Sequence, residues 1–325
     1  MVSRRLARFG LALGLALLLA SSSFAAHQVQ HCGSGGVPKA TLSKFDHDVL
    51  IQSAEALQTA EAKHLPFGFP TCPLRLINAF YIDCYDVERR VPLWGAYRLE
   101  GAEIRAAEQQ NAPRKESFRT DPRLQPEQSA TCEDFSKHRK KATGGDPKKN
   151  FQARGHTVPD ADFRSSQRGQ AYTYYLSNMT PQWQSFNGGI WARLEKNTRD
   201  WAKKFGSVQV ISGAIFDKDG DGRPDAPGDA DRMQPTKRVA VPTHYFRVLL
   251  RQDGTQLVAI ALLLPHWKTG RPPGPKKPPD QVLADHLVSI KDIRERVGVD
   301  LLPNLAPDTK AQLESAVASE LWPRN

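Results

Sequence analysis

Two neighbouring blocks of sequence decide how this 325-residue chain is interpreted. They are QARGHTVPDADF, residues 152–163, and, after a short gap, YYLSNMTPQWQSFNGGIWARLE, residues 174–195. In the first block, Arg154 and His156 lie two residues apart, and such residues point to the same side of an extended segment. We therefore expect both side chains to address one site. Gly155 between them has no Cβ, so the backbone there can lie close to a bound group.

The second block begins as a turn and becomes a helix. Gly188 and Gly189 are poor residues for a helix interior, so we predict a helix over residues 190–205. Asn187 stands at the entrance of this helix and Glu195 about two turns further on, so both can face the same side. Amide and carboxylate oxygens are hard ligands of the kind that Mg²⁺ prefers.

The remaining elements alternate between short strands and helices. We predict strands over residues 76–81 and 93–97, mainly loops over residues 101–150, and a hairpin around Asp253-Gly254. A final helix is expected over residues 309–322. Because most strands pair with close neighbours in the sequence, the pattern predicts an α+β fold with an antiparallel sheet core, and not a doubly wound sheet.

Four motifs together resemble a known family. RGH, LSNxxPQ, NxG and WARLE, in this order and spacing, are similar to those of the sugar-non-specific DNA/RNA endonucleases, the ββα-metal nucleases, of the exported bacterial type. Phe118–Pro122 and Val288–Leu302 resemble further segments of that family. The resemblance implies a ββα-metal active-site motif in a domain that covers residues 75–325.

The resemblance also implies roles for single residues. His156 is the expected general base, which takes a proton from water as a neutral imidazole can near pH 7. Asn187 is the expected ligand of Mg²⁺, with Mn²⁺ as an alternative ion. Glu195 is expected to orient water near that ion. These assignments predict a metal-dependent endonuclease that hydrolyses DNA and/or RNA and leaves 5′-phosphate ends.

Three other residues complete the expected site. Arg154 would bind phosphate through two hydrogen bonds, although a surface ion pair is the ordinary alternative for an arginine. Asn178 and Gln182 match family positions that support the site, or they are turn residues with local backbone hydrogen bonds.

Two departures from the family pattern leave another function open. Ala153 stands where the family commonly has Asp, and Glu116 stands where it has a second arginine. Arg114, Lys115 or Arg119 can replace that arginine. The alternative to an enzyme is therefore a catalytically silent protein that binds nucleic acid or another polyanion on the same fold.

The first residues indicate export. Arginines at positions 4, 5 and 8 precede the apolar run Leu11–Ala20, and Ser23-Phe24-Ala25 supplies small residues for cleavage. This pattern predicts a signal peptide over residues 1–25, a periplasmic or secreted protein, and no membrane contact in the mature form. Residues 26–74 would form an N-terminal extension of the main domain.

The chain has four cysteines, Cys32, Cys72, Cys84 and Cys132. In an oxidising compartment we expect two disulfides, and three pairings are open. A zinc site is the alternative, but the cysteines lack the C-x-x-C spacing that zinc sites use.

Positive charge favours a polyanionic substrate. The formal net charge is +10, and the basic run Lys137–Lys149 leads towards Arg154, either as a phosphate-binding loop or as a solvated one. A second basic run, Lys268–Pro279, is rich in proline and is expected to be an exposed loop. DNA and/or RNA are the expected partners, and the oligomeric state is open, a homodimer included.

A separate acidic segment follows the central helix. Asp217, Asp219 and Asp221, with Asp225 beyond them, begin a D-x-D-x-D-G pattern typical of calcium-binding loops. Gly228 occupies the place of the closing glutamate. The pattern is interpreted as a structural Ca²⁺ loop or as an acidic surface turn.

Overall fold

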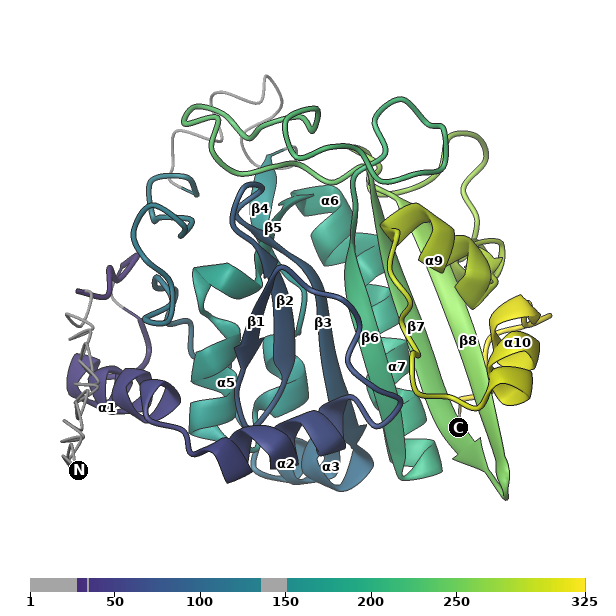
Figure 1. Cartoon of the computed structure of the whole chain (residues 1–325), viewed down its shortest axis with the longest axis horizontal. Helices are drawn as coiled ribbons and strands as arrows, with labels where there is room; N and C mark the ends of the chain where they lie inside the picture. Colours follow the sequence, from purple (N-terminus) through teal and green to yellow (C-terminus); the bar gives the residue numbers. More distant parts are fainter. Residues whose placement is uncertain (1–27, 34, 136–150, 325) are drawn as a thin grey trace, which may run out of the picture.

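A computed structural model describes residues 28–33, 35–135 and 151–324, so the predicted signal peptide and the basic run before Arg154 lie outside the described residues. Within them, one antiparallel sheet has the strand order β1-β2-β3-β6-β7-β8-β9 (Figure 1). The strands are β1 (Leu74–Ile77), β2 (Ile82–Asp86), β3 (Val91–Glu100), β6 (Ser207–Ile215), β7 (His244–Asp253), β8 (Gln256–Pro265) and β9 (Leu287–Val288). The predicted α+β class is confirmed.

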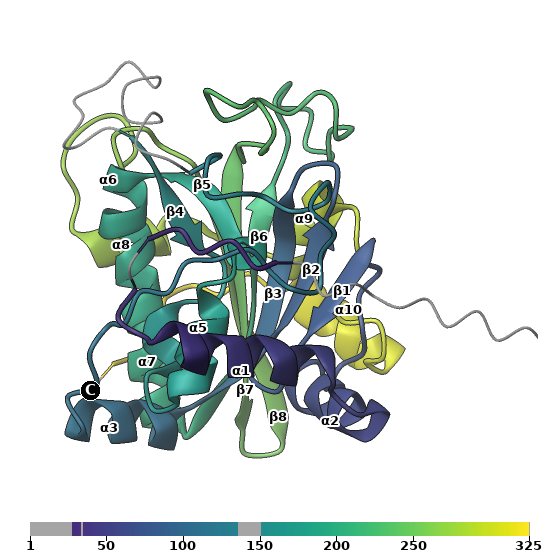
Figure 2. The same cartoon turned by 90° about the vertical axis from the view of Figure 1, so that its left-hand side faces the viewer.

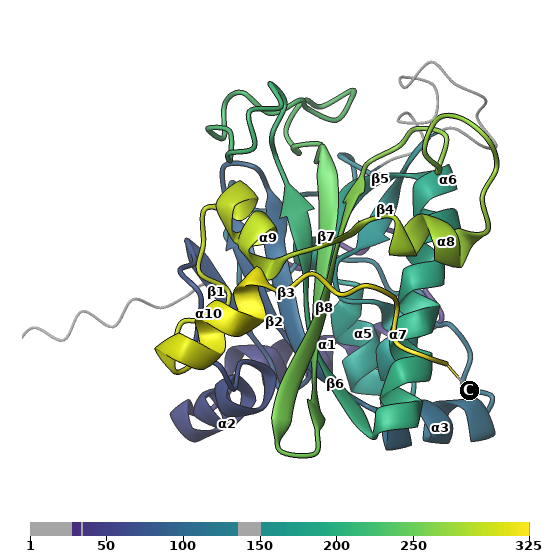
Figure 3. The ribbon, with the colours of Figure 1, turned by 90° about the vertical axis from the view of Figure 1, so that its right-hand side faces the viewer.

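Helices cover both faces of the sheet. On one side lie α2 (Ala54–His64), α9 (Ile290–Val297) and α10 (Pro307–Ser315), and on the other lie α3 (Gly101–Gln109), α7 (Ala192–Phe205) and α8 (Pro279–Ala284) (Figure 3). Both faces need a cover because strand β6 carries apolar side chains on each of them. Val208 and Val210 belong to the core beneath α7, whereas Ile211 and Ile215 belong to the core beneath α9. Alternate residues of a strand point to opposite faces, so a nearly continuous apolar strand fills two cores.

The connection between β3 and β6 carries the central motifs. It leaves the sheet at Gly101 and returns at Gly206, and the Gly101 amide donates to the Gly206 carbonyl over 2.8 Å. A Cβ on Gly101 would lie 2.2 Å from the Ala202 carbonyl oxygen, so this crossing requires glycine. Between these points lie α5 (Gln167–Thr173) and a two-stranded sheet of β4 (Gln152–His156) and β5 (Met179–Trp183) (Figure 2). The expected ββα unit is thus an excursion between two central strands.

Several predicted boundaries are wrong. Helix α3 occupies part of the region expected to be loops, and β2 lies between the two strands expected near the N-terminus. Helix α1 (Lys39–Leu50) precedes α2 and was not predicted. The hairpin around Asp253-Gly254 is confirmed, because β7 and β8 pair up to Asp253 and Gln256. The domain boundary at residue 75 stays a prediction.

The final helix is shorter than predicted, because it ends at Ser315. The chain beyond it runs in extended form along α7, where the Trp201 Nε1 donates to the Trp322 carbonyl over 2.8 Å and the two indole rings meet edge to face at 5.7 Å. Arg324 donates to the Asn197 side chain over 2.9 Å and also bonds Asp280. These contacts, and not a continued helix, make Trp322 partly buried.

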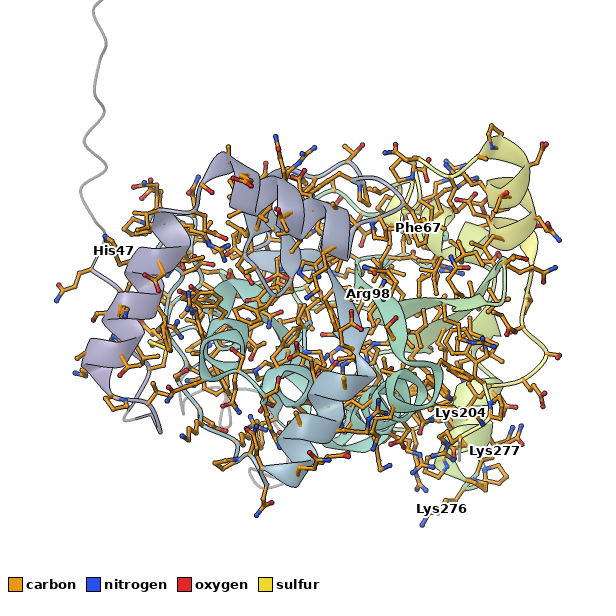
Figure 4. All side chains as sticks on the ribbon, turned by 90° about the horizontal axis from the view of Figure 1, so that it is seen from below. His47, Phe67, Arg98, Lys204, Lys276 and Lys277 are labelled. Atoms are coloured by element: carbon orange, nitrogen blue, oxygen red, sulfur yellow. A yellow bond between two sulfur atoms is a disulfide. The ribbon has the colours of Figure 1, made fainter. Side chains whose placement is uncertain are left out.

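Two disulfides are present, as expected. Cys32 pairs with Cys132, and Cys72 pairs with Cys84. No cysteine is free, so the zinc alternative is wrong. Among the described residues, no helix is long and apolar enough to span a membrane. The proline-rich basic loop is largely exposed, and Lys276 and Lys277 project from the margin of the molecule in Figure 4.

Candidate active site

The site is built on the β4–β5 hairpin and the helical segment that follows it. The antiparallel register places Arg154 opposite Pro181 and His156 opposite Met179. Strand β5 ends at Trp183 and continues at once into α6 (Gln184–Phe186), a π-helical turn (Asn187–Trp191) and α7. The two motif blocks therefore share one continuous ββα unit.

Arg154 and His156 lie on the same face of β4, as expected, because Phe118 touches both. The Arg154 guanidinium carbon lies 4.6 Å from the centre of the Phe118 ring, and the His156 ring centre lies 5.8 Å from it. Tyr174 meets the His156 ring edge to face at 5.1 Å. The aromatic pair packs against the imidazole and restrains its orientation.

His156 is a buried base without a hydrogen-bond partner at Nε2. The residue is 8% exposed, and no described residue bonds that nitrogen. Burial lowers the pKa of His156 to about 4, against the opposing effect of the Asp160 carboxylate. The imidazole is therefore neutral at pH 7 and holds a lone pair that can accept a proton.

Asp160 was missed in the sequence analysis. Its charge acts both on His156 of β4 and on Glu195 of α7. Its carboxylate raises the pKa of both His156 and Glu195, so it acts on both groups. Arg164 holds Asp160 through two donors at 3.0 Å each. Its position four residues after His156, in the 3₁₀ turn after Pro159, was the available signal.

Arg154 is half-buried and has no ion-pair partner within 4.0 Å among the described residues. Its Nη2 donates to the Phe135 carbonyl over 3.2 Å, while Nε has no partner in the described part of the chain. Burial lowers the pKa of the guanidinium, which remains a cation at neutral pH because its ordinary value is so high. The alternative of a surface ion pair is thus not observed, and donors remain for an anion.

Asn187 does not stand before the helix, because the helical path begins at Gln184 and Asn187 opens the π-turn within it. Gly189 supplies the irregular step, with φ −109° and ψ −108°. The two-turn argument that related Asn187 to Glu195 therefore does not hold for this interrupted helix. The Asn187 side chain makes no hydrogen bond with the residues that the structure describes, so its oxygen is available to a ligand.

Glu195 is partly buried in the first turn of α7. Burial raises the pKa of Glu195 to about 7; Arg247 and Arg199 oppose this rise, and Asp162 and Asp160 add to it. No described residue forms a hydrogen bond or ion pair with the carboxylate. A carboxyl group near two other carboxylates and without a hydrogen-bonded cation suits a divalent metal, and so does the unpartnered Asn187 oxygen. The donor set therefore fits Mg²⁺ or Mn²⁺.

Arg199 was also missed in the sequence analysis, although it follows Glu195 by one helical turn. Its Nη1 donates to Asp162 Oδ1 over 2.9 Å, and the Tyr97 hydroxyl donates to the other oxygen of Asp162 over 2.7 Å. This chain of contacts fastens α7 to the segment that follows His156. The spacing of i and i+4 was a signal for Arg199, but Asp162 is its partner only in three dimensions.

Asn178 and Gln182 lie beneath the site as packing residues. The Asn178 amide accepts from the Val158 backbone over 2.9 Å and donates to the Val158 and Thr173 carbonyls, each over 2.9 Å. A Cβ on Gly155 would lie 2.3 Å from the Gln182 side chain. Among the described residues, Gln182 makes the close approach at Gly155.

The upstream basic residues lie in different places. Arg119 is fully buried and pairs with Asp46 over 2.8 Å, so it serves the core. Arg114 pairs with Glu116 over 3.1 Å, and its charge lowers the pKa of His156. Arg114 therefore influences the charge state of His156, whereas Arg119 is paired within the core. Ala153, the other departure, is buried opposite Gln182.

The fold and site define a class of protein, and comparison with known proteins agrees. The family model of the DNA/RNA non-specific endonucleases matches residues 60–308, and the chain belongs to this family.

Individual relatives share about three tenths of their aligned residues with this chain. The mitochondrial nuclease EXOG of Danio rerio is 30% identical over 251 residues, which cover 74% of this chain and 64% of that protein. The mitochondrial endonuclease G of Homo sapiens is 29% identical over 246 residues, 74% of this chain and 73% of the relative. The mitochondrial nuclease of Saccharomyces cerevisiae (strain ATCC 204508 / S288c) is 28% identical over 271 residues, which cover 80% of this chain and 75% of the relative.

The prediction of export is wrong in the light of these relatives. All three are mitochondrial nucleases, which contradicts the predicted periplasmic or secreted location. The basic and apolar N-terminal pattern was interpreted as a secretory signal, although positive charge near the N-terminus is also common in mitochondrial transit peptides. The two disulfides do not decide between the compartments.

Proposed function

We propose that this protein is a metal-dependent endonuclease that hydrolyses phosphodiester bonds of DNA and RNA with little sequence preference and leaves 5′-phosphate ends. The proposal rests on the buried, neutral His156, whose Nε2 has no partner among the described residues, and on Arg154, which forms no ion pair with any of them. Membership of the non-specific endonuclease family supports it. The mitochondrial relatives support a mitochondrial location.

The chemistry divides between the two β4 side chains. His156 Nε2 takes a proton from a water molecule, whose oxygen then attacks phosphorus. The bond to the 3′ oxygen breaks, and that oxygen takes a proton from solvent to form the 3′-hydroxyl. Arg154 donates hydrogen bonds to the non-bridging oxygens as negative charge builds on them. The aromatic rings of Phe118 and Tyr174 hold the imidazole in place, which reduces the entropy lost in reaching the reactive geometry.

The helix side of the site would hold the metal. Asn187 would supply an oxygen ligand, and Glu195, whose pKa is influenced by Asp160 and Asp162, would orient water near the ion. Mg²⁺ or Mn²⁺, when bound, would neutralise charge on the phosphate and on the leaving 3′ oxygen. Arg199 and Asp162 would keep α7, and hence Glu195, in position.

Cleavage of supercoiled plasmid tests the proposal. We expect nicking with Mg²⁺, none with EDTA, and a loss of about 10²–10⁴-fold in rate for His156→Ala with DNA binding retained. His47→Ala is the matched control, because His47 is an exposed histidine on α1 at the margin of the molecule in Figure 4.

A negative result would favour the alternative function. If neither protein cuts DNA or RNA with Mg²⁺ or Mn²⁺ while both bind it in a salt-dependent manner, the chain is a catalytically silent nucleic-acid-binding protein. The substitutions at Ala153 and Glu116 motivate this alternative.

A further inference from the structure

An acidic loop leaves the sheet at the end of β6 and does not belong to the site described above. One carboxylate oxygen from each of Asp217, Asp219 and Asp221 lies within 4.8 Å of the others. The Asp225 amide donates to the Phe216 carbonyl over 2.8 Å and closes the loop. Three carboxylates so close together repel one another unless a cation or a proton separates their charges.

The loop backbone follows the course expected of a cation-binding turn. Asp219 Oδ1 accepts from the Asp221 amide over 3.2 Å, and Asp221 Oδ1 accepts from the Arg223 amide over 2.8 Å. Gly222, the sixth position counted from Asp217, has a φ of +82°, which few residues other than glycine adopt. A glycine at this position makes the sharp turn of calcium-binding loops.

Asp217 gives the independent sign that a ligand is needed. Its side chain is fully buried; Oδ2 accepts from Arg296 of α9 over 2.9 Å, whereas Oδ1 is buried with no partner in the described part of the chain. A buried carboxylate oxygen without a hydrogen bond is costly, and an adjacent cation would satisfy it.

We propose that this loop binds one Ca²⁺ ion through the carboxylates of Asp217, Asp219 and Asp221. The carbonyl of Arg223 and the carboxylate of Asp225 follow at the seventh and ninth positions, which also provide ligands in such loops. Five oxygen donors from the protein favour Ca²⁺ over Mg²⁺, which usually keeps several of its waters. Because Gly228 has no carboxylate to close the site, we expect a Kd on the order of 10⁻⁵–10⁻⁴ M.

The ion would have a structural task. Asp217 is bonded to Arg296 of α9, and the Asp225 carbonyl accepts from Arg89 after β2. Ordering this loop therefore joins the β6–β7 connection to α9, which lies on the face of the sheet opposite α7 (Figure 3). The proposal does not depend on nuclease activity, because no residue of this loop belongs to the candidate active site.

The test uses the full chain with Asn187→Ala, so that the candidate catalytic metal site does not contribute. Calorimetric titration with CaCl₂ is expected to show one ion bound, and about 1 mM Ca²⁺ is expected to raise the Tm by several degrees, because a ligand of the native state stabilises it. Adding Asp219→Asn and Asp221→Asn should abolish both effects. Adding Asp253→Asn instead, an exposed aspartate of the β7–β8 hairpin, should leave both unchanged.

The proposal is overturned if the Asn187→Ala protein binds no Ca²⁺, or if the doubly substituted loop still binds and is still stabilised. Asp219 and Asp221 are exposed, so their replacement spares the core, and circular dichroism checks the fold. If the double change unfolds the protein, Asp219→Asn alone takes its place with the same expectations. Hydrogen exchange gives a further readout: Ca²⁺ should slow exchange in residues 217–225 and in α9, and unchanged exchange in both segments would also overturn the proposal.

Discussion

Glu195 is the residue of the candidate site whose charge changes near neutral pH. Its pKa is raised to about 7, so it is largely protonated at pH 6 and ionised at pH 8. A nearby cation favours the ionised form. We therefore expect Mg²⁺ binding to release a proton near pH 7 and to tighten between pH 6 and pH 8, measured by calorimetry in two buffers of different ionisation enthalpy.

Two matched variants separate the titration of Glu195 from any effect of the general base His156 on Mg²⁺ binding. Glu195→Gln should lose the pH dependence of Mg²⁺ affinity, whereas His156→Ala should keep it, because a pKa of about 4 leaves His156 neutral throughout this range. Equal proton release by the Gln variant and the parent would refute the role of Glu195. The pH dependence of folding stability runs the other way from that of Mg²⁺ affinity. Because the pKa of Glu195 is raised in the folded protein, its contribution to the free energy of unfolding is present below the ordinary pKa of 4.5 and is lost as the pH rises through 7.

For single residues, the sequence predicted which side chains share a site only when they are close along the chain. Arg154 and His156 share a face because they are two residues apart on a strand, a relation fixed by strand geometry alone. Asp160 and Asp162 were missed because their importance depends on which arginines and which histidine approach them after folding. Their partners include Arg164 and Arg199, and sequence spacing alone does not show which carboxylates become buried.

The π-turn between α6 and α7 is the element that sets the direction of Asn187. Deleting Gly189 should convert the turn to regular helix and rotate Asn187 by about 100° relative to α7, since each residue of an α-helix turns by that angle. We expect the deletion to keep helical content by circular dichroism but to lose Mg²⁺ binding and plasmid nicking. π-turns of this kind occur often at functional sites.

Gly189→Ala is the control for this deletion. A Cβ at this exposed position would meet only the Gly270 carbonyl oxygen, at 3.9 Å, and φ is negative. The substitution should therefore keep metal binding and cleavage. A deletion variant that binds Mg²⁺ and cuts DNA as well as the Ala variant does would show that the π-turn has no part in placing Asn187.

Elements with strong local signals were predicted well. The β7–β8 hairpin follows from Asp-Gly between two apolar runs. The π-turn was not predicted, because two adjacent glycines indicate a helix start as readily as an irregular turn. The last helix was drawn too long because Trp322 resembles a helical core residue, whereas its burial comes from contact with α7.

For the whole molecule, the two disulfides are expected to differ in their effect on activity. The Cys32 amide donates to the Phe118 carbonyl over 2.8 Å, and Cys132 lies three residues before Phe135, whose carbonyl holds Arg154. Replacing Cys32 and Cys132 by Ser should lower the free energy of unfolding by about 2–5 kcal/mol. It should also lower kcat, because both supports of Arg154 lose their anchor.

Replacing Cys72 and Cys84 by Ser is the comparison. This bridge joins β2 to the segment before β1 with a sequence separation of 12, against 100 for the other, so its loss should reduce stability less and leave kcat unchanged. Denaturant unfolding and single-turnover cleavage below the transition measure the two effects. Equal kcat values for both double variants would contradict a link between the longer bridge and Arg154.

The overall architecture was predicted in class and not in topology. Alternating short strands and helices indicated α+β, but the sequence does not reveal that the ββα unit lies within the connection from β3 to β6. That arrangement depends on pairing between Glu100 and Ser207, more than a hundred residues apart.

The segment that lies along α7 also sets an order of events during synthesis. Trp201 and the Trp322 carbonyl that it bonds are separated by 121 positions, which a ribosome adding ~5–20 residues per second covers in ~6–24 s. Throughout that interval the helix that carries Glu195 lacks the contact between Trp201 and Trp322. The packing of α7 is therefore completed only after every strand of the seven-stranded sheet has been made.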